Sequence, residues 1–452
     1  MPGVPASLCQ NWHRLSAQTA FLSVSRMPDD AAPVTHLDLD HVRRQFPALA
    51  GDTVFFDNAG GSQTLGAVVD RIADYLRTTN VQLGASYGVS QASTEKVAAG
   101  VRAIASLFNA GDPSEVVLGP STTQLIANFA AALAPSLRPG DEIIVTDVDH
   151  ESNIGAWRRL AARGIEIREW RVDRERFVLD PEALEPLLSP RTRLVAMTHC
   201  SNVVGSIHPV REVAARVHAR GALLFVDGVA FAPHAPVDVA ALGVDGYVFS
   251  LYKVYGPHAA AMWVRREVFE KLDNINHDFL AGYVPYKIQP GGVNYELAHG
   301  ASAIPEYFDR LGESLPAADH SIQVQTQRIQ NPRGRAFQAI AAHEEALSAR
   351  LLAGLRSLPG VRIIGDPSAS RASRVPTISF VSDRHLSSAI PPRVDPHNIG
   401  IRFGDFYARR LIDALGLRDK DGVVRVSMVH YNTLAEVDRL LGALEAALAT
   451  AS

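Results

Sequence analysis

The chain has 452 residues, a formal net charge of −4 at pH 7 and a hydrophobic fraction of 47%. A chain of this length can bury a large core and form two domains, or one large domain with a smaller one. This composition predicts no binding to nucleic acid or to an anionic membrane, and no stretch is apolar for long enough to form a transmembrane helix. The only cysteines, Cys9 and Cys200, exclude a disulfide framework and favour a reducing compartment, so we expect a cytoplasmic protein.

The N-terminal region has no acidic residue before Asp29 and no ordered patterning before about Leu37. We predict a disordered extension over residues 1–36. A targeting peptide is the alternative, although its apolar part is short and interrupted. Met27 could be the native start. Residues 37–56 are predicted to pack on a small C-terminal domain.

Apolar, β-branched runs alternate with helical patterns through the middle of the chain. Helical patterns cover Thr123–Leu133 and Val210–Arg220. The alternation predicts an α/β fold with a largely parallel sheet and helices on both faces, which we assign to a large domain over residues 57–312. The predicted strands are 143–146, 165–167, 193–199, 222–227 and 247–250.

The pattern changes towards the C-terminus. Residues 313–335 are polar and without a clear period, so we predict a loop or insertion there. The remainder, residues 336–452, is predicted to form a small α+β domain. Its predicted elements are a long helix from about Arg335, strands at 361–364, 376–381 and 423–428, and a last helix from about Leu434 to Ala449.

Asp227 and Lys253 lie at or just after the ends of two successive apolar runs, in the stretches FVDG and SLYKVYGPH. Neighbouring parallel strands end at the same edge of a sheet, so both side chains could face one ligand. Pyridoxal phosphate (PLP) needs a lysine for its Schiff base and a carboxylate that keeps its pyridine nitrogen protonated. Taken alone, the pair would favour a simpler interpretation, a buried strand-end acid and a solvated lysine.

The motif Ser121-Thr122-Thr123 precedes an apolar helix, where hydroxyl groups and free backbone N–H groups can bind phosphate. A simple helix cap is an equally good interpretation of this motif. His150 follows a predicted strand and could stack on a flat ring; a surface histidine in a loop is the alternative.

Seven motifs carry a resemblance to the class V aminotransferases, the group of fold-type-I PLP enzymes that contains cysteine desulfurases and isopenicillin-N-epimerase-like enzymes. The resemblance runs from about Phe55 to the last helix. It implies a fold-type-I transferase with a mostly parallel, seven-stranded type of sheet, PLP as the cofactor and a homodimer. The motifs occur in the family's order: FFDNAGG (55–61), STT (121–123), DHESN (149–153), SNVVG (201–205), VDG (226–228), SLYK (250–253) and RVSMVHYNT (425–433).

The resemblance also implies roles for individual residues. Lys253 would form the Schiff base, Asp227 would hold the pyridine nitrogen and His150 would cover the ring. The remaining cofactor contacts implied by the family are Thr122, Thr123 and Ser250 at the phosphate and Asn202 near the phenolic oxygen.

Arg425, and as a second candidate Arg402, would hold the carboxylate of an amino-acid substrate. A surface arginine on an edge strand is the simpler alternative for Arg425. Gly292 and Asn294, in the stretch PGGVN, would reach the phosphate of the partner subunit, although an ordinary turn explains this stretch equally well. No metal site is predicted.

The chain departs from the cysteine desulfurases at the place of their nucleophilic cysteine. The local sequence is RFGDFYARR, with Tyr407 near the expected position and no cysteine close by. Two further family positions carry Ala230 in place of glutamine and Tyr252 in place of histidine. Without a thiolate to accept sulfur, a persulfide cannot form on this loop.

These observations predict a PLP-dependent enzyme that acts on an amino acid through a carbanion at Cα. A lyase-type reaction, C–S cleavage or another β-elimination, is the favoured prediction. An aminotransferase, or an epimerase or cyclase of specialised metabolism, is the alternative. A true cysteine desulfurase and a non-catalytic PLP-fold protein are less favoured.

Overall fold

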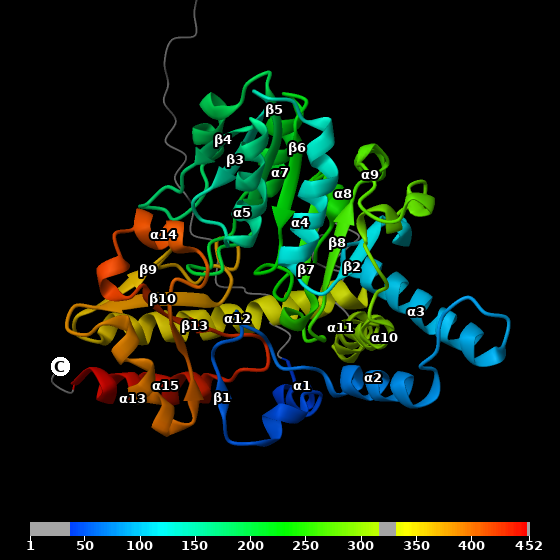
Figure 1. The fold of residues 1–452 in the computed structure, drawn as a ribbon. Helices are drawn as coiled ribbons and strands as arrows, with labels where there is room; N and C mark the ends of the chain where they lie inside the picture. The colour runs from blue at the N-terminus through cyan, green and yellow to red at the C-terminus, as the bar shows by residue number, and fades with distance from the viewer. Residues whose placement is uncertain (1–36, 316–330, 450–452) are drawn as a thin grey trace, which may run out of the picture. The chain divides into compact units, whose positions relative to one another are not determined.

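A seven-stranded sheet lies at the centre of the structure (Figure 1), a computed structural model that describes residues 37–315 and 331–449. The strand order is β2-β8-β7-β6-β5-β3-β4. β8 runs antiparallel to both of its neighbours, whereas the pairs from β7 to β4 are parallel. The predicted α/β fold is therefore confirmed. The strands are β2 (Val116–Gly119), β3 (Glu142–Thr146), β4 (Glu166–Trp170), β5 (Thr192–Thr198), β6 (Leu223–Asp227), β7 (Gly246–Ser250) and β8 (Ala260–Val264).

Helices cover both faces of this sheet because successive strand residues point to opposite sides. On β3, Ile143 joins the apolar cluster that includes residues of α4 (Thr122–Leu133) and α5 (Ser152–Arg158). Ile144 joins the other cluster, to which α7 (Val210–His218) contributes. The sequence analysis did not predict β2 and β8; the run Ala-Ala-Met-Trp-Val of β8 is rich in alanine, a residue with weak preference for strands.

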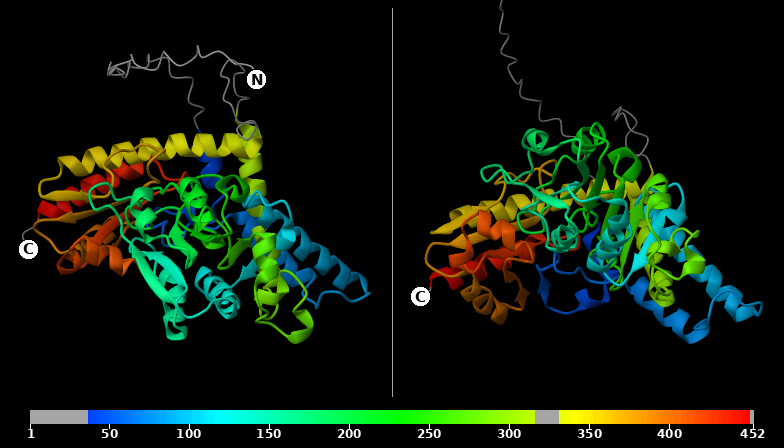
Figure 2. Two further views of the ribbon diagram at one scale, coloured as in Figure 1. Left: turned by 90° about the horizontal axis from the view of Figure 1, so that it is seen from above. Right: turned by 45° about the horizontal axis from the view of Figure 1, so that its top comes forward.

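A second, antiparallel sheet forms the C-terminal part, with the order β12-β13-β10-β9. Its apolar face packs on α12 and α15. Figure 2 shows the long helix α12, which contacts α15 in this part and α11 (Ala303–Ser314) beside the large sheet. The elements are α12 (Pro332–Ser357), β9 (Val361–Ile364), β10 (Thr377–Ser382), α13 (Pro391–Val394), β12 (Arg402–Gly404), α14 (Arg409–Ala414), β13 (Val423–Ser427) and α15 (Leu434–Ala449).

The ends of the range predicted as a loop, 313–335, are helical. Helix α11 continues to Ser314, and α12 begins at Pro332 because the Asn331 side chain caps it by accepting a hydrogen bond from the Gly334 N–H. The middle of this range, 316–330, lies outside the described residues, as does the extension predicted over residues 1–36.

The N-terminal segment joins the apolar cluster of the large sheet and forms a separate two-stranded sheet with a strand of the C-terminal part. Val42 and Phe46 belong to the apolar cluster of the large sheet, whereas β1 (Val54–Phe55) pairs in parallel with β11 (Ile399–Gly400) of the C-terminal part. The described residues form one compact unit, so the division into two domains stays a prediction.

A group of helices packs beside the large sheet, with α10 against α2 and α3 and α11 against α12. α3 approaches α10 closely at Gly100, where an added Cβ would lie 2.2 Å from the Ala298 carbonyl oxygen. Among the described residues, no helix is long and apolar enough to cross a membrane. The remaining helices are α1 (Leu39–Arg44), α2 (Gly66–Thr78), α3 (Gly88–Leu107), α6 (Pro181–Leu184), α8 (Val239–Leu242), α9 (Arg266–Lys271), α10 (Tyr295–Ala301) and α11 (Ala303–Ser314).

Candidate cofactor and substrate site

A cavity lies at the carboxyl ends of the central parallel strands, where ligands bind in open α/β sheets. It brings together seven of the predicted cofactor residues, which come from distant parts of the sequence. The lining residues are Ser121, Thr122, Thr123, His150, Ser152, Thr198, Cys200, Asn202, Asp227, Val229, Ala230, Ser250, Tyr252 and Lys253.

Asp227 is the last residue of β6 and is 4% exposed. Among the described residues, its carboxylate accepts one hydrogen bond, from the Val229 N–H at 2.9 Å. Burial raises the pKa of Asp227 to about 6, although the Val229 N–H and the charge of Lys253 oppose the shift. A buried carboxylate with so few donors fits a protonated ring nitrogen such as that of PLP.

Lys253 ends the 3-10 turn that follows β7 and is 9% exposed. No hydrogen bond joins its Nζ to another described residue. Burial, and after it the positive charge of Arg425, lowers the pKa of Lys253 to about 8, against the opposing effect of the Asp227 charge. A buried amine with a lowered pKa is more readily neutral, which is the form that can attack an aldehyde.

The first turn of α4 provides hydroxyl groups and backbone N–H groups on one side of the cavity. Ser121 caps the helix by accepting a hydrogen bond from the Gln124 N–H at 3.1 Å. The Thr122 and Ser250 hydroxyl oxygens lie 2.7 Å apart, so β7 and α4 meet here. Together with Thr123, these groups form an arrangement suited to a phosphate at the positive end of a twelve-residue helix.

His150 lies in the turn between β3 and α5. Burial lowers its pKa to about 4, and the charges of Lys253 and Arg425 add to the effect, so the ring is neutral at pH 7. Its Nδ1 lies 2.7 Å from the Ser152 hydroxyl oxygen. A neutral, anchored imidazole at the cavity wall is suited to packing against a flat ring.

Asp149 was not among the predicted site residues. Its buried side chain holds this turn in place through hydrogen bonds. It is fully buried and accepts hydrogen bonds from Thr146, from the Asn153 amide at 2.7 Å and from the Thr198 N–H at 3.0 Å. Burial nevertheless raises its pKa to about 8. Its position directly before His150 in the motif DHESN was the available signal.

Asn202 lines the cavity but its amide group is already engaged. The Nδ2 donates to the Phe406 carbonyl oxygen at 2.9 Å, while the backbone carbonyl of Asn202 accepts from Arg425 at 3.0 Å. Asn202 therefore also ties the large sheet to the C-terminal part.

Arg425 and Arg402, the two predicted carboxylate-binding residues, share one acidic partner. Asp57 contacts the Nη2 of Arg425 at 2.8 Å and the Nε of Arg402 at 3.0 Å. The Arg425 side chain is 2% exposed and that of Arg402 is 59% exposed. Asp57 was not predicted as a site residue, and its place in the motif FFDNAGG was the available signal. Two cations and one anion leave a net positive charge that a substrate carboxylate could neutralise.

Gly292 and Asn294 line a second cavity rather than the one with Lys253. This cavity also includes Gly119 and Pro120, directly before the first turn of α4. The Gln289 side chain, at the start of the same loop, accepts a hydrogen bond from the Leu118 N–H at 3.1 Å. A role of this loop at a partner's phosphate stays a prediction.

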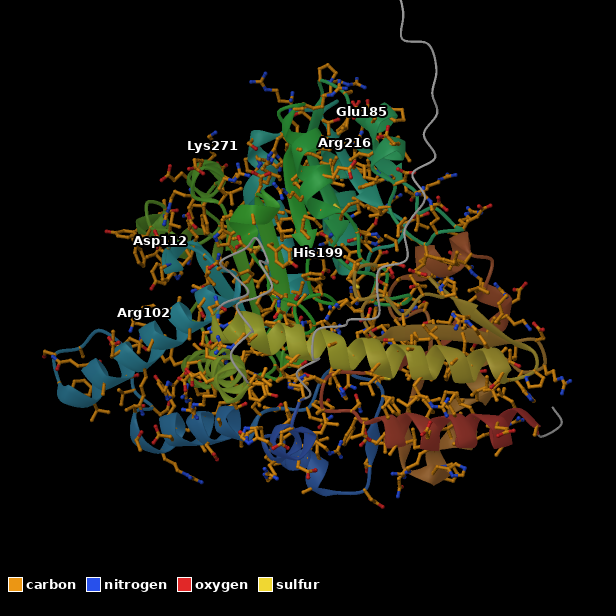
Figure 3. All side chains as sticks on the ribbon, turned by 180° about the vertical axis from the view of Figure 1, so that it is seen from behind. Arg102, Asp112, Glu185, His199, Arg216 and Lys271 are labelled. Carbon is orange, nitrogen blue, oxygen red and sulfur yellow. The ribbon has the colours of Figure 1, made fainter. Side chains whose placement is uncertain are left out.

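Cys200 is the free cysteine of the described residues, and Cys9 lies outside them. Cys200 is fully buried, and burial raises the pKa of its thiol. The preceding residue, His199, labelled in Figure 3, is also buried and stacks on Phe231 with 3.6 Å between ring centroids. Among the described residues, no group of histidine, cysteine and acidic side chains could hold a metal ion.

The fold is that of the fold-type-I PLP-dependent enzymes. The model of the aminotransferase class-V family matches residues 54–314 and 333–440, and the chain belongs to this family. Members of the family use PLP, so the chain is a PLP-dependent enzyme. The cavity fits PLP in the charge and hydrogen-bonding chemistry described above.

Two similar proteins are fungal. The chain is 44% identical to the aminotransferase-like protein FGM3 of Gibberella zeae, over 91% of this chain and 98% of that protein. It is 34% identical to the cysteine desulfurase-like protein ustD of Aspergillus flavus, over 89% and 88%. The crystal structure of the cysteine desulfurase CsdA from Escherichia coli has a TM-score of 0.76 and 26% identity, and covers 91% of this chain and 98% of its own.

Proposed function

We propose that this enzyme is a lyase that removes the α-proton of an amino acid and expels a group from Cβ, as in C–S cleavage or another β-elimination. The observation that carries the proposal is the buried amine of Lys253, which has a lowered pKa and no hydrogen bond to another described residue. When bound, PLP supplies an electron sink for the negative charge left at Cα.

Lys253 is proposed as the base. Its Nζ takes the proton from Cα, the electrons of that bond form a double bond between Cα and Cβ, and the leaving group departs with the electrons of its bond to Cβ. Asp227 holds the ring nitrogen in its protonated state, and His150 packs against the ring face.

The arginine pair is proposed to orient the substrate by its carboxylate. Arg402 presents the more accessible guanidinium, whereas Arg425 is fixed by Asp57 and by the Asn202 carbonyl. An incoming carboxylate would either join the three charged groups or displace Asp57 from one arginine.

Elimination is favoured over persulfide formation by the surroundings of the cysteines. The segment 401–410 contains no cysteine, and the Cys200 thiol, although it lines the cavity, is buried with a raised pKa. A sulfur-accepting cysteine needs a thiolate on an accessible segment.

An aminotransferase is the second candidate, and the 44% identity to the aminotransferase-like protein FGM3 supports it. The two candidates differ in products. Elimination from a cysteine derivative releases a thiol, ammonia and pyruvate, whereas transamination retains the carbon skeleton and needs a keto acid. The test is to incubate the enzyme with S-substituted cysteines, with and without added keto acid. Pyruvate formed without keto acid supports the lyase; turnover that depends on keto acid supports the aminotransferase.

We also propose a homodimer in which Gly292 and Asn294 approach the partner's phosphate site, and a cytoplasmic location. The position of both residues beside Pro120, close to the first turn of α4, is compatible with the first proposal. A fully active monomer in sedimentation experiments would contradict it.

A further inference from the structure

The turn after β12 has an unusual backbone. Phe406 and Tyr407 are consecutive and have φ values of 52° and 61°. Bulky side chains rarely adopt this left-handed conformation, because their Cβ atoms crowd the backbone. Such strain persists where the surrounding structure holds it in place, and it is often associated with a functional site.

Three contacts hold this turn against neighbouring segments of the candidate site, and a fourth lies within the turn. The Phe406 carbonyl accepts a hydrogen bond from the Asn202 amide at 2.9 Å, and the Phe406 ring lies 3.8 Å from the Arg425 guanidinium carbon. The Tyr407 carbonyl accepts a hydrogen bond from the Glu151 N–H at 2.7 Å, and the Tyr407 N–H donates to Asp405 at 2.9 Å. The turn is thus fixed to the residues that flank the cavity on both sides.

The turn directs the Tyr407 side chain to the edge of the cavity. Its ring centroid lies 5.2 Å from that of His150, at an angle of 38°, and His150 lines the cavity. Tyr407 is 72% exposed, so most of this aromatic surface is uncovered. Tyr407 lies beside the cavity and does not itself line it, but its ring contacts His150, which does; within the described part of the chain, Tyr283, another exposed tyrosine, makes no ring contact with a residue of either cavity.

We propose that Tyr407 determines substrate specificity by contacting the amino-acid side chain beyond Cβ. Its ring forms an apolar wall beside His150 that favours a substrate with a planar or apolar group at this position over one with a small side chain. The proposal rests on the proposed amino-acid substrate of the same site. In this role Tyr407 would provide a fixed aromatic surface where a desulfurase has its reactive cysteine.

The test compares binding of L-phenylalanine and L-alanine to the PLP-loaded enzyme, measured by the change in cofactor absorbance. We expect the native enzyme to bind L-phenylalanine more tightly. Tyr407→Ala should reduce the ratio of the two affinities about tenfold, because an aromatic contact is lost. Tyr407→Phe keeps the ring and should keep the ratio within about twofold. Tyr283→Ala, which removes an exposed tyrosine elsewhere, is the matched control.

An unchanged ratio in Tyr407→Ala, or an equal loss in Tyr407→Phe, would overturn the proposal. Tyr407→Leu provides a second variant of similar bulk without a planar face, should the alanine variant fail to fold. The binding ratio does not depend on which reaction follows. The affinity ratio could therefore change as expected while the enzyme forms no pyruvate from S-substituted cysteines. That outcome would contradict the proposed lyase and retain the role of Tyr407.

Discussion

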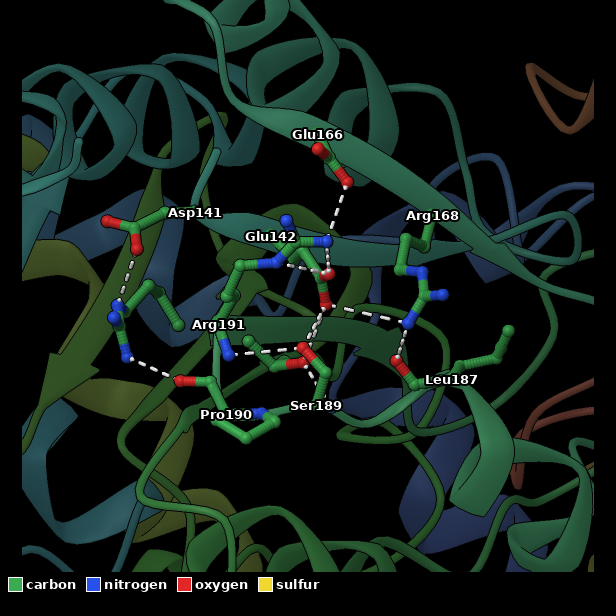
Figure 4. Close-up of polar contacts among 10 residues, drawn as sticks. Asp141, Glu142, Glu166, Arg168, Leu187, Ser189, Pro190 and Arg191 are labelled. Atoms are coloured by element: carbon green, nitrogen blue, oxygen red, sulfur yellow. Dashed lines mark hydrogen bonds and ion pairs between the residues drawn. The ribbon is translucent and has the colours of Figure 1, made fainter. Parts of the chain in front are cut away.

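Two buried carboxylates at opposite ends of the large sheet differ in how they are satisfied. Glu142 begins β3, and its side chain is 1% exposed; Figure 4 shows it among Arg191, Arg168 and Ser189. Arg191 Nη2 lies at 2.7 Å, Arg168 Nη1 at 3.5 Å and the Ser189 hydroxyl at 2.7 Å. Asp227 ends β6 with a single backbone donor among the described residues.

The pKa values of the two groups follow this difference. Burial opposes ionisation of Glu142, but its hydrogen bonds, from Ser189 first and then Arg191, outweigh that effect and lower the pKa. Burial of Asp227 is only partly offset, by the Val229 N–H and the charge of Lys253, and its pKa rises to about 6. The amino end of the sheet is thus satisfied by the protein itself, whereas the carboxyl end retains groups suited to a ligand.

The largest expected effect is at Lys253. Lys253→Ala should lower turnover by at least about 10³-fold, because it removes both the attachment point of PLP and the proposed base. Reduction of the native enzyme with borohydride followed by peptide mass spectrometry should place the cofactor on Lys253. A label on another lysine would contradict the assignment.

The second-largest expected effect on activity is at Asp227. Asp227→Asn should still bind PLP but lose activity about 10²-fold or more, because a neutral amide cannot hold the protonated ring nitrogen. The same substitution should stabilise the PLP-free protein at pH 7 by about 1–3 kcal/mol, since it removes a buried charge.

The pH dependence of the PLP-free protein provides the control for this substitution. The folded pKa of Asp227, about 6, exceeds its ordinary value of 3.8, so the folded state binds more protons and stability should fall as pH rises from about 4 to about 6. Urea unfolding should show that Asp227→Asn weakens this fall. For the activity prediction, near-native turnover of Asp227→Asn would show that Asp227 has only a structural role.

Local pattern placed Asp227, Lys253 and His150 at or just after strand ends, but their assignment to one cofactor site came from the family resemblance. Asp227, Lys253 and His150 each follow an apolar run, and parallel strands bring such ends together. Asp57, the acidic partner that Arg402 and Arg425 share, was not predictable in this way, because Asp57 and Arg425 are 368 residues apart in the chain. The left-handed conformation of Tyr407 was also hidden, since it depends on hydrogen bonds from other segments.

At Glu142 we expect an effect on stability with little effect on activity. Glu142→Gln should destabilise the protein by about 2 kcal/mol, because the amide cannot satisfy the surrounding donors, although Arg168 and Arg191 are partly exposed and remain hydrated. Glu166→Gln is the matched control: Glu166 also contacts Arg191, at 3.3 Å, but its side chain is 52% exposed, so its loss should cost less than about 0.5 kcal/mol.

The pH dependence tests the cause of the Glu142 effect. The folded pKa of Glu142 lies below its ordinary value of 4.5, so its stabilisation is present above that pH and is lost as pH falls through the folded pKa. The difference between the native protein and Glu142→Gln in urea unfolding should therefore narrow below about pH 4.5. A constant difference would indicate a packing effect instead of a charge effect.

The smallest expected effect is at the cysteines. Replacing both, Cys9→Ala/Cys200→Ala, should leave elimination within about threefold of the native rate, because neither thiol contributes to the proposed reaction. Cys200 is the stricter test since it lines the same cavity as Lys253, yet its Sγ faces the Gly205 carbonyl at 3.3 Å. Incubation with cysteine followed by intact-mass measurement should show no added sulfur. Sulfur transfer that disappears in the double variant would restore the desulfurase interpretation, whereas release of ammonia and pyruvate that survives the replacement places the reaction at the cofactor alone.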